Sequence, residues 1–244
     1  MFNVQPATCN AQHVTHVVLE ELIMIVGEQK PIEDIMSYID GCEKILLSGC
    51  HGCVTVCCTG GQKEVEVLAS MIELGRKRRG QPVQVTQMMQ ERQCDVEFLE
   101  DLIAKAKDHD VILSMACGVG VQLVAENAGP IKVFPAIDTN FTGAIHEKGV
   151  WGERCQLCGD CKLHLTGGIC PVTRCSKSLM NGPCGGSRDG YCEIDPEIAC
   201  GWQLIIDRLD ETGCMDQYEV ILEPADWSKS RDGGPRKHVR EDLK

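Results

Sequence analysis

Seventeen cysteines in a chain of 244 residues constrain this protein more than any other feature of its sequence. Eight of them precede residue 150, eight lie between residues 155 and 200, and Cys214 stands alone. An odd number of thiols does not pair fully into disulfides. Disulfides are also rare in a reducing cytosol, which is where we expect this chain to be. We therefore expect most of the thiols to bind metal.

Charge and hydropathy narrow the location and the partners. The formal net charge is −12 and the isoelectric point is near 5.0, which argues against nucleic acid or an anionic membrane as the main partner. No run of about 18 apolar residues is present, so we expect no membrane span. The beginning of the sequence does not have the order of charged and apolar residues of a secretory signal, so we expect a cytoplasmic protein.

The first 150 residues alternate short apolar runs with amphipathic segments. Strands are expected at residues 44–48, 82–88, 110–116 and 131–137. Helices are expected at residues 60–80, 94–110 and 118–129. A further N-terminal helix is expected at residues 20–28 or 31–39. This order predicts an α/β fold, a Rossmann/flavodoxin-like parallel sheet with right-handed crossovers.

The rest of the chain has a different character. Residues 151–223 are rich in Gly, Pro and Cys and show no helix or strand period except at 201–210, where a short helix is expected. Such a stretch needs something other than an apolar core to order it, so it is predicted to be a small Cys-rich metal-binding domain. Residues 224–244 form an extended basic tail. Three units are thus predicted: 1–150, 151–223 and 224–244.

A first group of thiols follows the predicted strands. Cys50, Cys53 and Cys57 come after the first strand, Cys94 after the second and Cys117 after the third. The carboxyl ends of parallel strands share one edge of the sheet, where such folds bind their ligands. Helix N-termini there favour thiolates, and neighbouring glycines let backbone amides approach sulfur. The four ligands expected first are Cys50, Cys53, Cys57 and Cys117, with Cys94 as a close rival.

A second group of eight cysteines occupies the Cys-rich region. They are Cys155, Cys158, Cys161, Cys170, Cys175, Cys184, Cys192 and Cys200. The opening C-x2-C-x2-C is similar to a ferredoxin run and favours an iron–sulfur cluster. A ferredoxin reaches its Cys-Pro after three residues, whereas eight intervene here, so the fourth ligand stays open among Cys170, Cys175 and Cys184. Zinc also accepts four thiolates, and a zinc site built from the remaining cysteines stays open.

Long stretches of the sequence resemble a known family. The second half contains "CGDCKLHLTGGICPVTRCSKSLMNGPCGGSRDGYCEI", then "CGW" and "DWSKSRDGGPR". These strings closely resemble the methylenetetrahydrofolate reductase C-terminal domain family. The first half contains "GCHGCVTVCCTGG", "ERQCDVEF" and "SMACGVGVQ". It is similar to the companion subunit of that reductase in acetogenic bacteria.

The resemblance implies a division of labour between two proteins. A separate flavin-containing catalytic subunit would reduce methylenetetrahydrofolate in the Wood–Ljungdahl pathway. The present chain would be its non-catalytic iron–sulfur subunit, with [4Fe–4S] clusters, one in each half. Electrons would come from reduced ferredoxin or a larger electron-bifurcating complex and pass to the flavin. No residue of this chain is expected to be catalytic.

Two other functions stay open from the sequence. The chain could be a zinc-binding scaffold of the same reductase without a redox role. It could also be an independent enzyme, because the pair Cys57–Cys58 is similar to the paired cysteines of heterodisulfide reductases, although no second "CCG" follows. The basic tail could be extended and silent, or it could fold against the flavoprotein.

Overall fold

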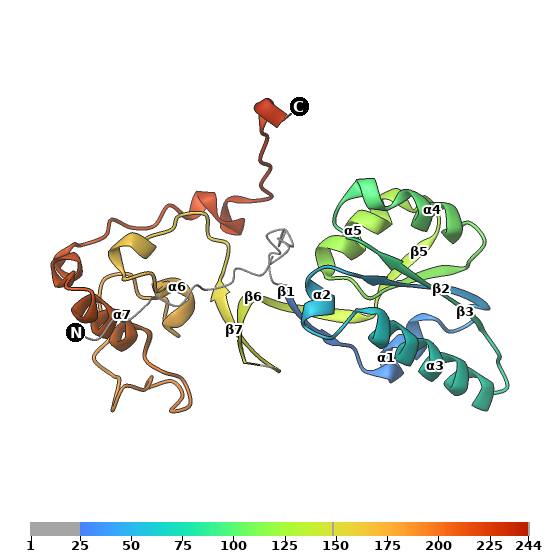
Figure 1. Cartoon of the computed structure of the whole chain (residues 1–244), viewed down its shortest axis with the longest axis horizontal. Helices are drawn as coiled ribbons and strands as arrows, with labels where there is room; N and C mark the ends of the chain where they lie inside the picture. Colours follow the sequence, from blue (N-terminus) through green and yellow to red (C-terminus); the bar gives the residue numbers. More distant parts are fainter. Residues whose placement is uncertain (1–24, 148, 244) are drawn as a thin grey trace, which may run out of the picture.

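The structure is a computed structural model, and it describes residues 25–147 and 149–243 (Figure 1). The strands are β1 (Ile25–Gln29), β2 (Lys44–Cys50), β3 (Gln84–Gln90), β4 (Val111–Ser114), β5 (Lys132–Pro135), β6 (Ile137–Glu147) and β7 (Val150–Cys155). The helices are α1 (Ile32–Tyr38), α2 (Cys53–Val56), α3 (Gln62–Arg78), α4 (Glu100–Ala106), α5 (Gly118–Asn127), α6 (Pro171–Arg174) and α7 (Gly201–Glu211). Short 3-10 helices lie at Val96–Phe98, Leu163–Leu165, Met215–Glu219, Trp227–Lys229, Arg231–Gly233 and Glu241–Leu243.

Four strands form the predicted parallel sheet, in the order β3-β2-β4-β5. Along the chain this is the order 2-1-3-4, as in flavodoxin-like folds, and the order reverses next to β2. Ile45 and Leu47 of β2 pack with α1 and α3, whereas Leu46 packs with α4 and α5. Helices therefore cover both faces of the sheet, as Figure 1 shows, and the predicted α/β class is confirmed.

A second sheet was not expected from the sequence. It is antiparallel, with the order β1-β6-β7. A helix was expected at residues 20–28 or at 31–39. Residues 25–28 belong to β1, so a helix there is wrong, and residues 20–24 lie outside the described residues. The helix at 31–39 is confirmed as α1. The hairpin of β6 and β7 runs across residue 150, the predicted boundary between the first two units. The division into three units stays a prediction. Most side chains of β6 are exposed, which explains why its apolar pattern was too weak to detect.

The Cys-rich region contains little regular structure apart from α7. This helix buries Trp202, Ile205 and Leu209 in a small apolar cluster, with Cys175, Cys200 and other partly buried residues around it. The predicted helix at 201–210 is thus confirmed. Among the described residues, no helix combines the length and apolar character needed to cross a membrane.

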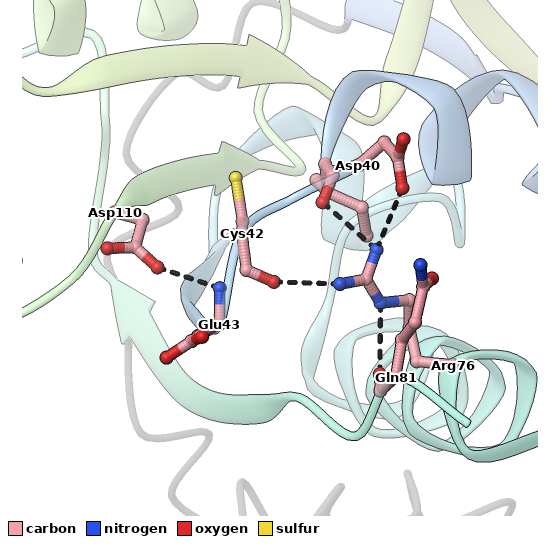
Figure 2. Close-up of polar contacts among 7 residues, drawn as sticks. Asp40, Cys42, Glu43, Arg76, Gln81 and Asp110 are labelled. Atoms are coloured by element: carbon pink, nitrogen blue, oxygen red, sulfur yellow. Dashed lines mark hydrogen bonds and ion pairs between the residues drawn. The ribbon is translucent and has the colours of Figure 1, made fainter. Parts of the chain in front are cut away.

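A buried arginine fixes the connection between α1 and β2, as Figure 2 shows. Arg76 of α3 is 4% exposed. Its guanidinium donates to the backbone oxygen of Cys42 at 3.0 Å, to that of Gln81 at 3.2 Å and to Asp40 Oδ1 at 3.3 Å. These acceptors lie in the turn before β2 and just after the end of α3. Arg76 therefore holds α3 against the start of β2, the strand that ends at Cys50.

Asp110 fixes the start of the same strand. Its Oδ2 accepts hydrogen bonds from the backbone N–H groups of Glu43 and Lys44 at 2.8 and 2.9 Å. These two N–H groups, that of Lys44 first, lower the pKa of the Asp110 carboxyl below its ordinary value of 3.8. A carboxyl with a lowered folded-state pKa stabilises the fold above its unfolded-state pKa, and the contribution is lost as the pH falls through the folded-state value.

We expect Asp110→Ala to lower the free energy of unfolding by about 1 kcal/mol at pH 7, a modest value because the carboxyl is exposed. The difference from the native protein should shrink as the pH falls below 3.8. Urea denaturation at several pH values measures both effects. Asp108→Ala, at a neighbouring exposed carboxylate, is the control. An equal loss at pH 7 and at low pH would contradict this account.

Candidate metal centres

Three loops bring four thiols to the carboxyl edge of the parallel sheet. Cys50 ends β2, Cys53 begins α2, Cys94 lies in the loop after β3, and Cys117 precedes α5. Charge on Cys94 or Cys117 acts on Cys50, and charge on Cys117 or Cys53 acts on Cys94. Charge acts in this way over short distances, so the four residues lie near one another at this edge. The edge is next to β2, where the strand order reverses. We call these four residues the N-terminal thiol group.

Burial works against thiolates in this group. Burial raises the pKa of the Cys50 thiol, the charges of Cys94 and Cys117 add to this, and the backbone N–H groups of Gln93 and Gly52 oppose it. Burial, followed by the charges of Cys117 and Cys53, also raises the pKa of Cys94. The expected lowering by helix N-termini is thus outweighed at Cys50 and Cys94. A bound cation would reverse the balance, because it offsets both the desolvation and the repulsion.

Cys57 lies in the same apolar cluster as Cys50, and Cys117 packs against that cluster. Cys57 is 4% exposed. Its Sγ lies 3.1 Å from the hydroxyl oxygen of Thr59. Cys58 is exposed and has a φ of 56°. Cys57 and Cys94 thus both lie at this edge with Cys50 and Cys117, and the choice between them as ligands stays a prediction.

A residue that the sequence reasoning missed holds the loop of Cys94. Gln93 is fully buried. Its Nε2 lies 3.1 and 2.9 Å from the backbone oxygens of Ser48 and Gly49, and its Oε1 accepts from the hydroxyl of Ser114 at 2.7 Å. The loop after β3 is thus tied to the ends of β2 and β4. A glutamine in a predicted loop gives no indication in the sequence that it is buried and ties the loop to the sheet. The one available indication is that Gln93 directly precedes Cys94.

Unpaired hydrogen-bond donors provide a test of whether a metal–sulfur group fits here. Trp151 packs against the apolar cluster that contains Cys50 and Cys57, with Cys117 packed against it. Its Nε1 is buried without a partner among the described residues, and so is Nε2 of Gln90. Sulfur atoms of a bound group would accept from such donors. Four thiols beside spare N–H groups are therefore a fitting set for a metal–sulfur centre.

In the Cys-rich region, four of the eight cysteines line one cavity of about 120 Å³. They are Cys155, Cys158, Cys161 and Cys170. The Cys155 sulfur accepts from the backbone N–H of Leu157 at 3.3 Å, a bond made possible by the left-handed backbone of Leu157, whose φ is 56°. Of the three candidates for the fourth position, the one that shares this cavity is Cys170.

The basic tail packs on the loop of this cavity. Arg236 donates to the backbone oxygens of Leu157 and Lys229, at 2.8 and 2.9 Å. At Gly159, which has a φ of 81°, a Cβ atom would lie 2.9 Å from the backbone oxygen of Lys229. The tail therefore contacts the chain's own Cys-rich region, and contact with a partner protein stays a prediction.

The other four cysteines line a second, smaller cavity of about 20 Å³. They are Cys175, Cys184, Cys192 and Cys200. The backbone N–H of Gly186 donates to the Cys184 sulfur at 3.4 Å. The hydrogen bond between the Cys192 sulfur and the Ser176 hydroxyl, 3.4 Å long, is the main cause that lowers the pKa of Cys192. Lys177 and Glu193 line the same cavity and form an ion pair.

The two sets of four cysteines in the Cys-rich region each line a cavity, but the thiols are not arranged around a metal ion. Within residues 25–147 and 149–243, no three His, Cys, Asp or Glu side chains are placed so that they could hold a metal ion. Metal binding by the predicted residues is therefore a matter for proposal and experiment.

Comparison with known proteins relates one part of the chain to a family. Residues 134–228 match the family described as methylene-tetrahydrofolate reductase C terminal. This range contains all eight cysteines of the Cys-rich region and the β6–β7 hairpin, but none of the N-terminal thiol group. Neither the search of curated proteins nor that of solved structures gave a match. The C-terminal region of this chain is thus similar to the family of methylene-tetrahydrofolate reductase C-terminal domains, over less than half of the chain.

Proposed function

We propose that the chain is the iron–sulfur electron-transfer subunit of a methylenetetrahydrofolate reductase complex. The family match supports the link to the reductase. The observation that carries the electron-transfer role is the grouping of twelve cysteines into three sets of four. They are Cys50, Cys53, Cys94 and Cys117; Cys155, Cys158, Cys161 and Cys170; and Cys175, Cys184, Cys192 and Cys200.

The sets differ in the space that they enclose. A cavity needs roughly 10–15 Å³ to hold one water molecule, so 20 Å³ suits a single ion and 120 Å³ suits a group of several atoms. We assign an iron–sulfur cluster to the set that includes Cys155 and a zinc ion to the set that includes Cys175. The spare N–H donors beside the N-terminal thiol group favour a second cluster there.

The proposed role of this chain's residues is to hold and tune these centres. Thiolates bind the metals, backbone amides such as that of Leu157 donate to sulfur, and the apolar packing around Cys50 limits access of water. Iron–sulfur clusters supply one-electron transfer. The flavin-containing catalytic subunit would be the acceptor, and ferredoxin or an electron-bifurcating complex the donor. A cytoplasmic location remains part of the proposal.

The test is metal analysis of the full chain purified without oxygen. We expect about eight irons with matching acid-labile sulfide and about one zinc per chain. The iron centres should take up electrons in a redox titration, and the reduced chain should pass them to the flavoprotein. Zinc without iron or sulfide would instead favour the scaffold function, for which the small cavity is the supporting observation.

A further inference from the structure

Gln90 has a buried side-chain amide that nothing in the described structure satisfies. The residue ends β3 and is 5% exposed. Its Nε2 is buried and has no hydrogen-bond partner among the described residues. An unpaired buried donor costs about 1–3 kcal/mol, so native proteins rarely keep one without a partner. A missing acceptor is therefore expected next to Gln90.

The register of the sheet shows which face Gln90 occupies. Gln90 pairs with Cys50 across the parallel strands β2 and β3, which lie about 4.8 Å apart. Side chains alternate along β3: Met89 packs with α1 and α3, whereas Met88 packs with α4 and α5. Gln90 therefore shares the face of Met88 and of Cys50. Cys50 belongs to the apolar cluster against which Cys117 and Trp151 pack.

A second buried glutamine nearby provides a contrast. The side chain of Gln93 uses both its Nε2 and its Oε1 in hydrogen bonds to Ser48, Gly49 and Ser114. Its amide is accounted for by the protein alone. The amide donor of Gln90 is not, although both residues lie at the same edge of the sheet. Gln93 is thus a structural tether, and Gln90 carries a spare donor.

We propose that Gln90 donates a hydrogen bond from Nε2 to a sulfur of the metal centre held by Cys50, Cys53, Cys94 and Cys117, and so raises its reduction potential. The inference rests on the proposed function, since it requires that centre. Reduction adds one negative charge to the centre, and an N–H dipole stabilises the reduced form more than the oxidised form. Burial strengthens the effect because few water molecules screen it.

The test is Gln90→Met in the full chain, purified without oxygen. Methionine keeps the volume and removes the donor. We expect the one-electron reduction equilibrium of the N-terminal centre to shift about tenfold towards the oxidised form, which is about 59 mV. A redox titration followed by electron paramagnetic resonance measures the shift. Cys155→Ala can be added to remove the signal of the C-terminal cluster.

Metal-free protein separates tuning from a structural role. In urea denaturation, metal-free Gln90→Met should be at least as stable as the native chain, because an unsatisfied buried group is removed. The matched control Gln93→Met should be clearly less stable, because it removes the hydrogen bonds from Nε2 to the oxygens of Ser48 and Gly49 and the acceptor of the Ser114 hydroxyl. Gln90→Glu, which cannot donate when ionised, should lower the potential further than Gln90→Met.

Two results would overturn the inference alone. One is an unchanged potential in Gln90→Met. The other is a loss of metal-free stability equal to that of Gln93→Met, which would make Gln90 a structural residue. A native chain without any redox-active centre at Cys50, Cys53, Cys94 and Cys117 would overturn the proposed function as well, so the two failures are distinguishable.

Discussion

Replacing Cys94 with alanine is expected to remove the metal of the N-terminal thiol group, about four irons per chain, and to leave the metals of the Cys-rich region in place. The reason is that Cys94 lies near Cys50, Cys53 and Cys117. A cluster that loses one of four thiolates, at a site where burial already disfavours charge, is not retained. Iron and sulfide analysis of anaerobically purified variants measures the effect.

Cys57→Ala is the matched control for this prediction. Cys57 is also buried at this edge, but its sulfur contacts the Thr59 hydroxyl. The variant should keep the full iron content and lose only about 1 kcal/mol of stability from lost packing. Cys58→Ala, at an exposed position, should change neither the iron content nor the stability. Loss of iron in Cys57→Ala with retention in Cys94→Ala would show that Cys57 is the ligand, as the sequence alone favoured.

Substitutions in the Cys-rich region are expected to fall into two classes. Cys170→Ala should lose the same four or so irons as Cys155→Ala, because both residues line the larger cavity. Cys175→Ala should instead lose zinc and keep iron, because Cys175 lines the smaller cavity. Measurement of iron and zinc per chain in each variant assigns every cysteine to a centre.

Double variants make this assignment independent of general damage to the fold. Cys155→Ala combined with Cys170→Ala should lose no more metal than either single variant, since both remove the same centre. Cys155→Ala combined with Cys175→Ala should lose both iron and zinc. If Cys170→Ala lost zinc, or Cys175→Ala lost iron, the partition into two sets of four would be wrong.

The parallel sheet could be predicted from the sequence because its strands are buried on both faces. Residues 45–47 of one such strand are all apolar, and the helices between the strands repeat their apolar residues every three or four positions. The antiparallel sheet could not be predicted, because β6 is largely exposed and has no strong alternation. Its pairing with β1, more than a hundred residues away, depends on contacts that local patterns do not encode.

The candidate sites divide in the same way. Strand order sufficed to place cysteines at one edge of the sheet, because residues after parallel strands must meet there. Spacing sufficed to predict a metal-binding stretch, which stays a prediction. The proposed choice of Cys94 over Cys57, and of Cys170 over Cys175, rests on the folded chain. Cys53 and Cys57 lie one turn apart at the two ends of α2, so their spacing alone does not distinguish them as ligands. Distant residues such as Cys50 and Cys94 are instead brought together by the packing of loops, which here depends on the buried hydrogen bonds of Gln93.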